Sequence, residues 1–325
     1  MKTLTWAVLG ASGFVGSAVV AELRARGHEV RALPAPRLRS TGTTAADMVR
    51  EARTLAANTE SPHAALTAAL SGVDVLINAA GLATPGDGES ADLTGANALL
   101  PVVAALAASA AGVRRFIHLS SASVQGHRAV IDETTFRAPF SPYSRSKALG
   151  EEAVEALSPT QVLRHGATGD AMDVVVLRAT SVQGPSRPTT LSLLKVAASP
   201  LASVASPGTA ATPVSSIDAL AWFVAETGLF AGEVPGLVLQ PWEGVSVTEV
   251  LEAAGGRAPL HLPQWLCRAA VATGYTVSRL LGERLHGPVR RVELMWFGQA
   301  QRPGWAQQER LVPTPAVQEL LRQAQ

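Results

Sequence analysis

The stretch "AVLGASGFVGSAVVAEL" (residues 7–23) places Gly10, Gly13 and Gly16 between two apolar runs. A buried strand that ends in a glycine-rich turn and opens into a helix lets backbone N–H groups approach a pyrophosphate at the positive helix end. The same glycines could also form a simple turn between a strand and a helix. The apolar run before them, the Ala/Val-rich run after them and a second apolar run from residue 29 favour the nucleotide cradle.

Composition narrows the classes of protein. The chain has 325 residues, 47% of them hydrophobic, and a net charge of +1, which supports a buried core and gives no electrostatic reason for a nucleic-acid or membrane partner. The one cysteine, Cys267, excludes an internal disulfide and fits a reducing compartment. The most membrane-like stretch, residues 265–282, contains Arg268 and Arg279, which favours a packed amphipathic helix. We therefore expect a cytoplasmic protein.

Short β-branched runs alternate with Ala/Leu-rich helical stretches along the first two-thirds of the chain, which predicts an α/β fold. The expected strands are 5–10, 29–34, 74–80, 115–121, 173–179 and 236–242. The expected helices are 14–26, 44–58, 91–112, 143–157 and 216–228. Segment 35–62 has no convincing strand, and the strand rhythm stops after about residue 243.

This pattern predicts a doubly wound parallel sheet of the Rossmann type with a smaller, mainly helical C-terminal substrate domain. We expect the dinucleotide-binding domain to comprise residues 1–183 and 213–242. The substrate-binding part would then comprise residues 184–212 and 243–325.

The end of the second expected strand bears on the choice of cofactor. An acidic residue there binds the free ribose 2′-hydroxyl of NAD, but this chain has Pro34 at that position. Arg37 and Arg39 follow shortly afterwards and could grip a 2′-phosphate with charge-assisted hydrogen bonds. The alternative is an ordinary solvated loop. We expect NADP(H), with NAD(H) as the alternative.

A tyrosine and a lysine in "SPYSRSKALGEE" (141–152) indicate acid–base chemistry. Tyr143 and Lys147 are four residues apart and therefore share one helix face. A nearby ammonium lowers the pKa of a phenol from its usual value of about 10 and makes it a usable general acid or base. Upstream, "FIHLSSASVQG" (116–126) ends an expected strand in serines, where a doubly wound sheet binds its ligand.

Together these motifs resemble the extended short-chain dehydrogenase/reductase family, of the NAD-dependent epimerase/dehydratase type, over roughly residues 5–250. The motifs that carry the resemblance are the Gly10–Gly16 loop, "DVLINAAG" (74–81), "FIHLSSASVQG", the Tyr143/Lys147 pair and "VLRATSVQGP" (176–185). By this resemblance Tyr143 exchanges the proton at the reacting carbinol or carbonyl. Lys147 holds the nicotinamide ribose and tunes the tyrosine, Ser121 hydrogen-bonds the substrate oxygen, and Asn97 is the active-site asparagine.

The resemblance also implies a set of cofactor-binding residues. Together with Lys147, these are Gly10, Ser12, Gly13, Phe14, Val15, Gly16, Asn78, Ala79, Ala80, Gly81, Ala179, Ser181 and Val182, and they add to Arg37 and Arg39, which the end of the second strand already indicated. Arg178 would lie near the nicotinamide end. The implied partner is a small-molecule substrate, and a homodimer is left open.

Two departures from the family pattern narrow the reaction. Ala122 and Ser123 follow Ser121, where sugar dehydratases have an Asp-Glu pair, so dehydration is not expected. Thr212 stands where many nucleotide-sugar enzymes have an arginine that clamps the diphosphate. Either another arginine compensates the diphosphate or the substrate is not a nucleotide sugar. The candidate substitutes are Arg187, Arg290 and Arg291.

Three functions remain open from the sequence. The first is an NAD(P)-dependent oxidoreductase acting at a secondary alcohol or ketone of a sugar-like or other small substrate. The second is an NAD(P)-dependent sugar epimerase that oxidises its substrate transiently. The third is a non-catalytic NADP-sensing regulator, which the Tyr143/Lys147 pair disfavours.

The remaining polar and aromatic residues are expected to be structural. We expect His118 to be packed in the sheet, and Glu151 and Glu152 to form a solvated helix face. Trp265, Trp296 and Trp305 are expected to anchor the packing of the smaller domain. The seven histidines show no metal-ligand spacing, so no metal is expected.

Overall fold

The computed structural model describes residues 4–83, 88–157, 171–185, 187–282 and 285–325. Its chain divides into two compact units. Unit 1 comprises Met1–Val124, Pro142–Arg178 and Ala221–Val238, and unit 2 comprises Gln125–Ser141, Ala179–Leu220 and Leu239–Gln325.

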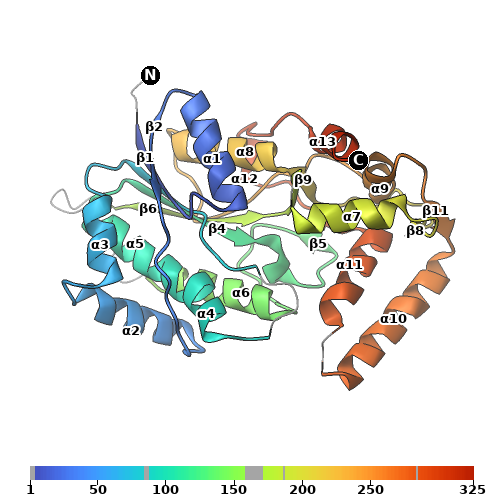
Figure 1. Ribbon diagram of the computed structural model, residues 1–325, viewed down its shortest axis with the longest axis horizontal. Coiled ribbons are helices and arrows are strands. Elements are labelled where there is room, and N and C mark those ends of the chain that lie inside the picture. The colour runs from blue at the N-terminus through green and yellow to red at the C-terminus, as the bar shows by residue number, and fades with distance from the viewer. Residues whose placement is uncertain (1–3, 84–87, 158–170, 186, 283–284) are drawn as a thin grey trace. The chain divides into compact units, whose positions relative to one another are not determined.

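Unit 1 is built on a six-stranded sheet with the order β10-β6-β4-β3-β1-β2 (Figure 1). Its strands are β1 (Thr5–Leu9), β2 (Glu29–Leu33), β3 (Val75–Asn78), β4 (Arg115–Ser121), β6 (Asp173–Ala179) and β10 (Leu237–Leu239). β1 pairs in parallel with both β2 and β3, and β3 pairs in parallel with β4. The strand order therefore reverses between β1 and β3. In doubly wound sheets, ligands bind outside the carboxyl ends of the strands at such a reversal.

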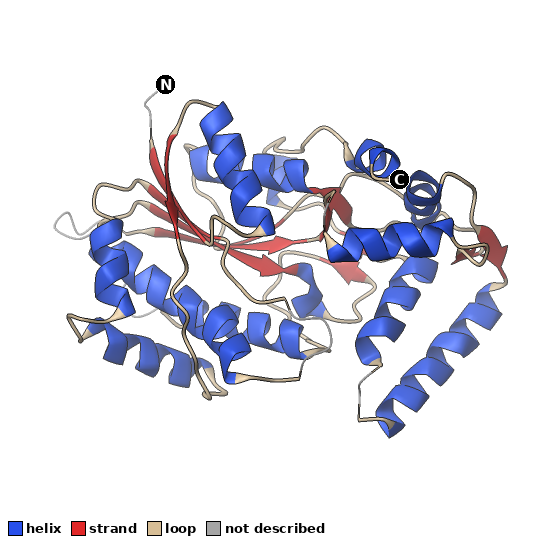
Figure 2. Cartoon of the chain, in the orientation of Figure 1, coloured by secondary structure: helices blue, strands red, loops and turns tan. Residues whose placement is uncertain are grey.

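Helices cover both faces of this sheet (Figures 1 and 2). On one face lie α1 (Phe14–Ala25) and α8 (Ile217–Leu229). The other face carries α2 (Ala45–Ala56), α3 (Pro62–Ala69), α5 (Leu100–Ala110) and α6 (Pro142–Glu155). The short helices α4 (Ala91–Thr94) and the π-helix η1 (Gly95–Leu99) lead into α5, and the 3-10 helix η2 (Ala122–Gln125) follows β4.

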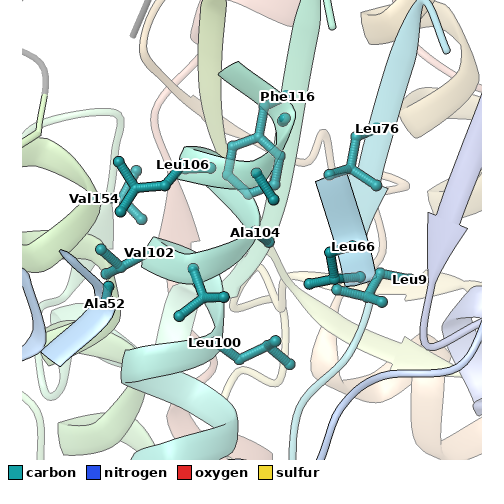
Figure 3. Close-up of a cluster of buried hydrophobic side chains, with 14 of the residues drawn as sticks. Leu9, Ala52, Leu66, Leu76, Leu100, Val102, Ala104, Leu106, Phe116 and Val154 are labelled. Carbon is teal, nitrogen blue, oxygen red and sulfur yellow. The ribbon is translucent and has the colours of Figure 1, made fainter. Parts of the chain in front are cut away.

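The main core of unit 1 lies between the sheet and α5 (Figure 3). Residues 100–109 of α5 are all buried, because Ala and small apolar side chains let neighbouring helices and the sheet approach from several sides. Leu9, Leu76 and Phe116 from three strands pack in the same cluster. Helical residues Ala91–Ala110 are apolar and long enough to cross a membrane, but 83% of that window is buried, as expected of a core helix.

Unit 2 combines three small two-stranded sheets with helices. The strands are β5 (Val130–Ile131), β7 (Ser181–Gln183), β8 (Ser203–Ala205), β9 (Val214–Ser216), β11 (Leu260–Leu262) and β12 (Ala300–Gln301). The helices are α7 (Pro188–Ala198), α9 (Val247–Gly255), α10 (Gln264–Leu280), α11 (His286–Phe297), α12 (Trp305–Gln308) and α13 (Val317–Gln323). The apolar faces of α7, α9 and α13 form its core.

The predicted strands, helices and fold class are confirmed, and α3 is an additional helix that the sequence pattern did not reveal. The two units have different bounds from the predicted domains. Residues 125–141 belong to unit 2 because β5 pairs with β12, and Ala300 N–H donates to Ala129 O over 2.9 Å. A pairing between segments so far apart in sequence leaves no local signal.

Three predictions for the C-terminal part of the chain have different outcomes. α10 is a helix with one buried stripe, at Cys267, Val271 and Ser278, as the sequence indicated. Trp265 is 72% exposed, so its prediction as a packing anchor is wrong. Trp305 is buried, and its prediction is confirmed.

Candidate active site and cofactor site

The glycine turn after β1 is shaped by contacts that exclude side chains. Gly10 has a φ of +80°, and a Cβ there would lie 2.8 Å from the Ala80 backbone. A Cβ on Gly16 would overlap the carbonyl oxygen of Gly10. Gly10 and Gly16 are therefore needed for the close approach of the β1 turn to the β3 loop and to α1.

The start of α1 fits an anion-binding role. Gly13 is the N-cap and provides no side-chain cap, and the first turn contains no acidic residue. Ser12 precedes the cap, and Phe14, Val15 and Gly16 form the first turn. A helix start with this composition presents a positive dipole end without a competing carboxylate. In other dinucleotide-binding folds, a helix start of this kind holds the pyrophosphate.

The loop after β3 is held by its own hydrogen bonds. Ala79 N–H donates to Leu9 O over 3.0 Å, which ties this loop to the end of β1. The buried Asn78 accepts a hydrogen bond from Ala80 N–H at Oδ1, over 3.2 Å, and its Nδ2 lies 3.2 Å from Nδ1 of His118. Asn78 therefore shapes the turn rather than pointing out of it. His118 is fully buried, as predicted, and burial keeps its pKa well below the usual value.

Asn97 also holds the loop after β3. Its Oδ1 accepts a hydrogen bond from Leu82 N–H, and its Nδ2 donates to Leu82 O and to Ser146 Oγ, each over 2.9 Å. Asn97 lies in the π-helix η1, a widened turn inside an otherwise α-helical segment, and π-turns of this kind are frequent at functional sites. The side chain thus joins the β3 loop to α6, which carries Tyr143 and Lys147.

Lys147 is the buried cation of the site. Its Nζ donates a hydrogen bond to Leu119 O on β4 over 3.0 Å. A Cβ on Gly81 would lie only 3.0 Å from the same Nζ, so the ammonium lies directly against the loop after β3. Burial lowers the pKa of Lys147 to about 8, while the charge of Glu151 opposes this shift. The ammonium is therefore charged at neutral pH but loses its proton more easily than an ordinary lysine.

Tyr143 and Ser121 occupy the ends of the two elements beside Lys147. Tyr143 is half-buried in the first turn of α6, four residues before the lysine. Ser121 is the last residue of β4 and is half-buried. Its Oγ accepts a hydrogen bond from Ser123 N–H over 3.2 Å and lies 2.8 Å from Ser123 Oγ. The predicted residues Asn97, Ser121, Tyr143 and Lys147 all belong to unit 1.

The prediction that Glu151 lies on a solvated helix face is wrong. Its carboxylate is fully buried and forms a two-pronged ion pair with the fully buried Arg178, with Nε–Oε1 at 3.0 Å and Nη2–Oε2 at 2.7 Å. Ser120 Oγ donates a third hydrogen bond to the carboxylate over 2.6 Å. Sequence offered one signal: an arginine inside the apolar strand "DVVVLRA" needs a buried partner. Glu152, the neighbouring acid, is exposed as expected.

The two arginines predicted for a 2′-phosphate lie in the extended segment after β2. Both are exposed, and Arg39 pairs with Asp92 at 3.2 Å. β2 ends at Leu33, whose carbonyl accepts Gly10 N–H over 3.0 Å. No acidic residue occurs between this point and residue 46, so none occupies the position that would bind a free 2′-hydroxyl.

The other predicted binding residues belong to unit 2. Ser181 and Val182 lie in β7, and Ala179 precedes it. Arg187, proposed as a diphosphate clamp, donates to the Val182 carbonyl.

The other two arginines proposed as diphosphate clamps differ in exposure. Arg290 is buried and donates to Glu293 Oε2 over 2.8 Å and to Gly126 O over 3.0 Å. Arg291 is exposed. Among the described residues, no group of His, Cys, Asp and Glu side chains could hold a metal ion.

The sequence model of the NAD dependent epimerase/dehydratase family matches residues 6–212, which is more than half of the chain. The chain belongs to this family. It is therefore an enzyme of the NAD-dependent epimerase/dehydratase family, with a nicotinamide dinucleotide as its cofactor. Among curated proteins, no sequence match was found.

Solved structures share the fold of this family member at low sequence identity. The crystal structure of gox2253 is 21% identical; the match covers 99% of this chain and 97% of that chain, with a TM-score of 0.66. UDP-glucuronic acid 4-epimerase from Bacillus cereus, in complex with UDP-glucuronic acid and NAD, is 19% identical, with 98% and 96% coverage and a TM-score of 0.60. MoeE5 in complex with UDP-glucuronic acid and NAD is 23% identical, with 80% and 85% coverage and a TM-score of 0.54.

Proposed function

We propose that this enzyme transfers a hydride between a nicotinamide cofactor and a secondary alcohol or ketone of a small, sugar-like substrate. The observation that carries the proposal is the buried ammonium of Lys147, which lies against the β3 loop, donates to Leu119 O at β4 and follows Tyr143 by about one helical turn. An ammonium beside a phenol favours the phenolate, so Tyr143 can exchange a proton near neutral pH.

The side chains divide the proton chemistry between them. The cofactor supplies or accepts the hydride. In the reductive direction Tyr143 donates its proton to the carbonyl oxygen of the substrate, and Lys147 stabilises the phenolate that remains. Ser123 Oγ lies 2.8 Å from Ser121 Oγ and can donate its proton to it, which leaves the Ser121 proton for the same substrate oxygen. Asn97 keeps the β3 loop and α6 together and acts by positioning.

We propose NADP(H) as the preferred cofactor. The cradle at Gly10 and Gly16 fits a dinucleotide, because side chains at both positions would collide with backbone. The end of β2 lacks a carboxylate for a 2′-hydroxyl, and the exposed Arg37 is available for a 2′-phosphate. NAD(H) is the alternative, and the UDP-glucuronic acid 4-epimerase and MoeE5 structures contain NAD.

The decisive experiment follows the nicotinamide itself. The purified protein is scanned at 340 nm, dialysed, and titrated with NADPH and NADH by energy transfer from its six tryptophans. We expect exchangeable cofactor, tighter binding of NADPH, and a steady loss of absorbance with at least one member of a panel of ketones and keto sugars. Failure to bind either cofactor would overturn the proposal.

The second candidate function is epimerisation through transient oxidation. It is favoured by the full-length structural likeness to a UDP-glucuronic acid 4-epimerase. An epimerase must keep its cofactor bound through both hydride transfers. The purified protein would then retain its nicotinamide cofactor during dialysis and would not exchange it with added NADPH or NADH. The same absorbance experiment therefore separates the two candidates.

A further inference from the structure

The proposed chemistry leaves one buried charged pair without a role. Glu151 and Arg178 are both fully buried, and their two-pronged contact joins α6 to β6 inside unit 1. Breaking such a pair is costly, yet an apolar pair of the same volume is often as stabilising. Stability alone therefore gives no physical reason for placing two charges there.

The position of the carboxylate suggests one. Glu151 follows Lys147 by four residues on α6, so the two side chains occupy the same helix face, one turn apart. Ser120 O–H donates to Glu151, and the neighbouring residue Leu119 accepts the hydrogen bond of Lys147. One stretch of β4 thus holds both the lysine and the glutamate.

The charges around Lys147 come from four elements. Tyr143 and Glu151 are on α6, Arg178 is on β6, and the neutral amide of Asn97 is on η1. His118 on β4 is kept uncharged by burial and by the cation itself. Among these described groups, Glu151 is the permanent negative charge beside the buried ammonium, and Arg178 is the positive charge that offsets it.

We propose that Glu151 is a positioning residue for the reaction: clamped by Arg178 and Ser120, its carboxylate keeps Lys147 charged and in place beneath the catalytic tyrosine. Arg178 carries a positive charge against the same carboxylate and weakens the attraction of Glu151 for the Lys147 ammonium. The Arg178 charge therefore limits how far Glu151 raises the pKa of Lys147. The expected effect on turnover rests on the proposed function. The expected effect on the pKa of Lys147 does not depend on that function.

Two substitutions break the same ion pair with opposite electrostatic effects. Glu151→Gln removes the negative charge that favours the ammonium and keeps the Arg178 cation, so the pKa of Lys147 should fall. Arg178→Gln removes the positive charge paired with Glu151 and keeps the carboxylate, so the pKa of Lys147 should rise. A merely structural pair would give similar losses of stability in both variants and no opposed shifts. We expect each shift to be about one unit, at the lower end for a nearby buried charge.

The direct measurement is the ¹³C NMR titration of ε-labelled lysine in the full chain. The sequence contains only Lys2, Lys147 and Lys195, and Lys147→Met assigns the signal of interest. The expected result is a lower midpoint in Glu151→Gln and a higher one in Arg178→Gln. Glu152→Gln, which changes the exposed neighbouring acid, is the matched control and should leave the midpoint unchanged.

Shifts in the same direction, or no shift in either variant, would overturn the proposal. If the single variants do not fold, the double variant Glu151→Met with Arg178→Met removes both charges while filling the space. Loss of the Glu151 carboxylate, whose charge raises the pKa of Lys147, should still lower the Lys147 midpoint there, and an unchanged midpoint would overturn the proposal.

Kinetics provide a separate readout. The alkaline limb of the pH–kcat/KM profile should move with the Lys147 midpoint in each variant. Opposed NMR shifts without any turnover on the substrate panel would leave the role of Glu151 standing and count against the proposed hydride transfer. Turnover with unchanged Lys147 midpoints would support the proposed hydride transfer and overturn the role of Glu151.

Discussion

Tyr143 and Lys147 are the two side chains on which the proposed chemistry depends. The phenol needs a charged neighbour, and the neighbour is a lysine with a lowered pKa of about 8. We predict that Tyr143→Phe binds nicotinamide cofactor with nearly unchanged affinity but loses turnover by about 10²–10⁴-fold, the usual contribution of one acid–base group. Fluorescence titration and steady-state assays check the two halves. A fully active variant would contradict the assignment of Tyr143.

Lys147 also makes stability depend on pH. The folded chain loses the lysine proton above about pH 8, whereas the unfolded chain keeps it to about pH 10.5. Between these values the unfolded state binds more protons, so the free energy of unfolding should rise with pH. Relative to Lys147→Met, we expect wild type to gain about 1–3 kcal/mol from pH 7.5 to 10. Urea denaturation at both pH values measures the difference, and equal slopes for both proteins would refute it.

Arg37 is the residue through which the cofactor preference can be tested. It is exposed, whereas the neighbouring Arg39 is paired with Asp92. We predict that Arg37→Ala weakens NADPH binding by about tenfold, or 1.4 kcal/mol, through loss of a charge-assisted hydrogen bond, and leaves NADH binding unchanged. Arg39→Ala is the matched control, with a smaller effect on NADPH. Equal losses for both cofactors in the Arg37 variant would rule out the 2′-phosphate role.

At the scale of elements, the turn between β1 and α1 depends on the missing side chain of Gly16. A methyl group there would overlap the Gly10 carbonyl oxygen. We predict that Gly16→Ala pushes α1 away from the turn, weakens cofactor binding and costs about 1–3 kcal/mol of stability. Thermal melts with and without NADPH measure both effects, and Ser17→Ala, one residue further along the exposed side of α1, is the control. An unaffected Gly16 variant would show that the close approach is not needed.

At the scale of the molecule, Arg115 ties together three separate segments of unit 1. It is fully buried on β4, pairs with Asp173 on β6 at 2.8 Å, and donates to the carbonyls of Thr227 and Phe230 at 2.9 and 2.8 Å. We predict that Arg115→Met lowers the free energy of unfolding by about 2–4 kcal/mol, because the carbonyls of Thr227 and Phe230 lose their donor, whereas Asp173, with a side chain 43% exposed, is hydrated instead. Chemical denaturation measures this. Arg114→Met, at the half-buried neighbour, should cost far less.

Much of the fold could be predicted because its signals are local. In the six-stranded sheet, β1, β3, β6 and β10 are largely apolar runs, and the parallel order of the sheet follows from the helices between its strands. The glycine spacing in the β1 turn and the Tyr143/Lys147 spacing on α6 depend only on the geometry of one turn and one helix. The break at residue 125 could not be predicted, because the pairing of β5 with β12 joins segments with no shared pattern.

Sequence by itself determined the family and predicted the cofactor cradle and the acid–base pair, because each of these signals consists of residues spaced a few positions apart. Only the tertiary structure decided the surroundings of that pair. The sequence pattern places Glu151 on a solvated helix face, but in the structure its carboxylate pairs with Arg178 from β6, 27 residues away. Asn97 became a bridge between the β3 loop and α6 for the same reason. Burial and charge partners are properties of packing between distant segments, and they set the pKa of Lys147.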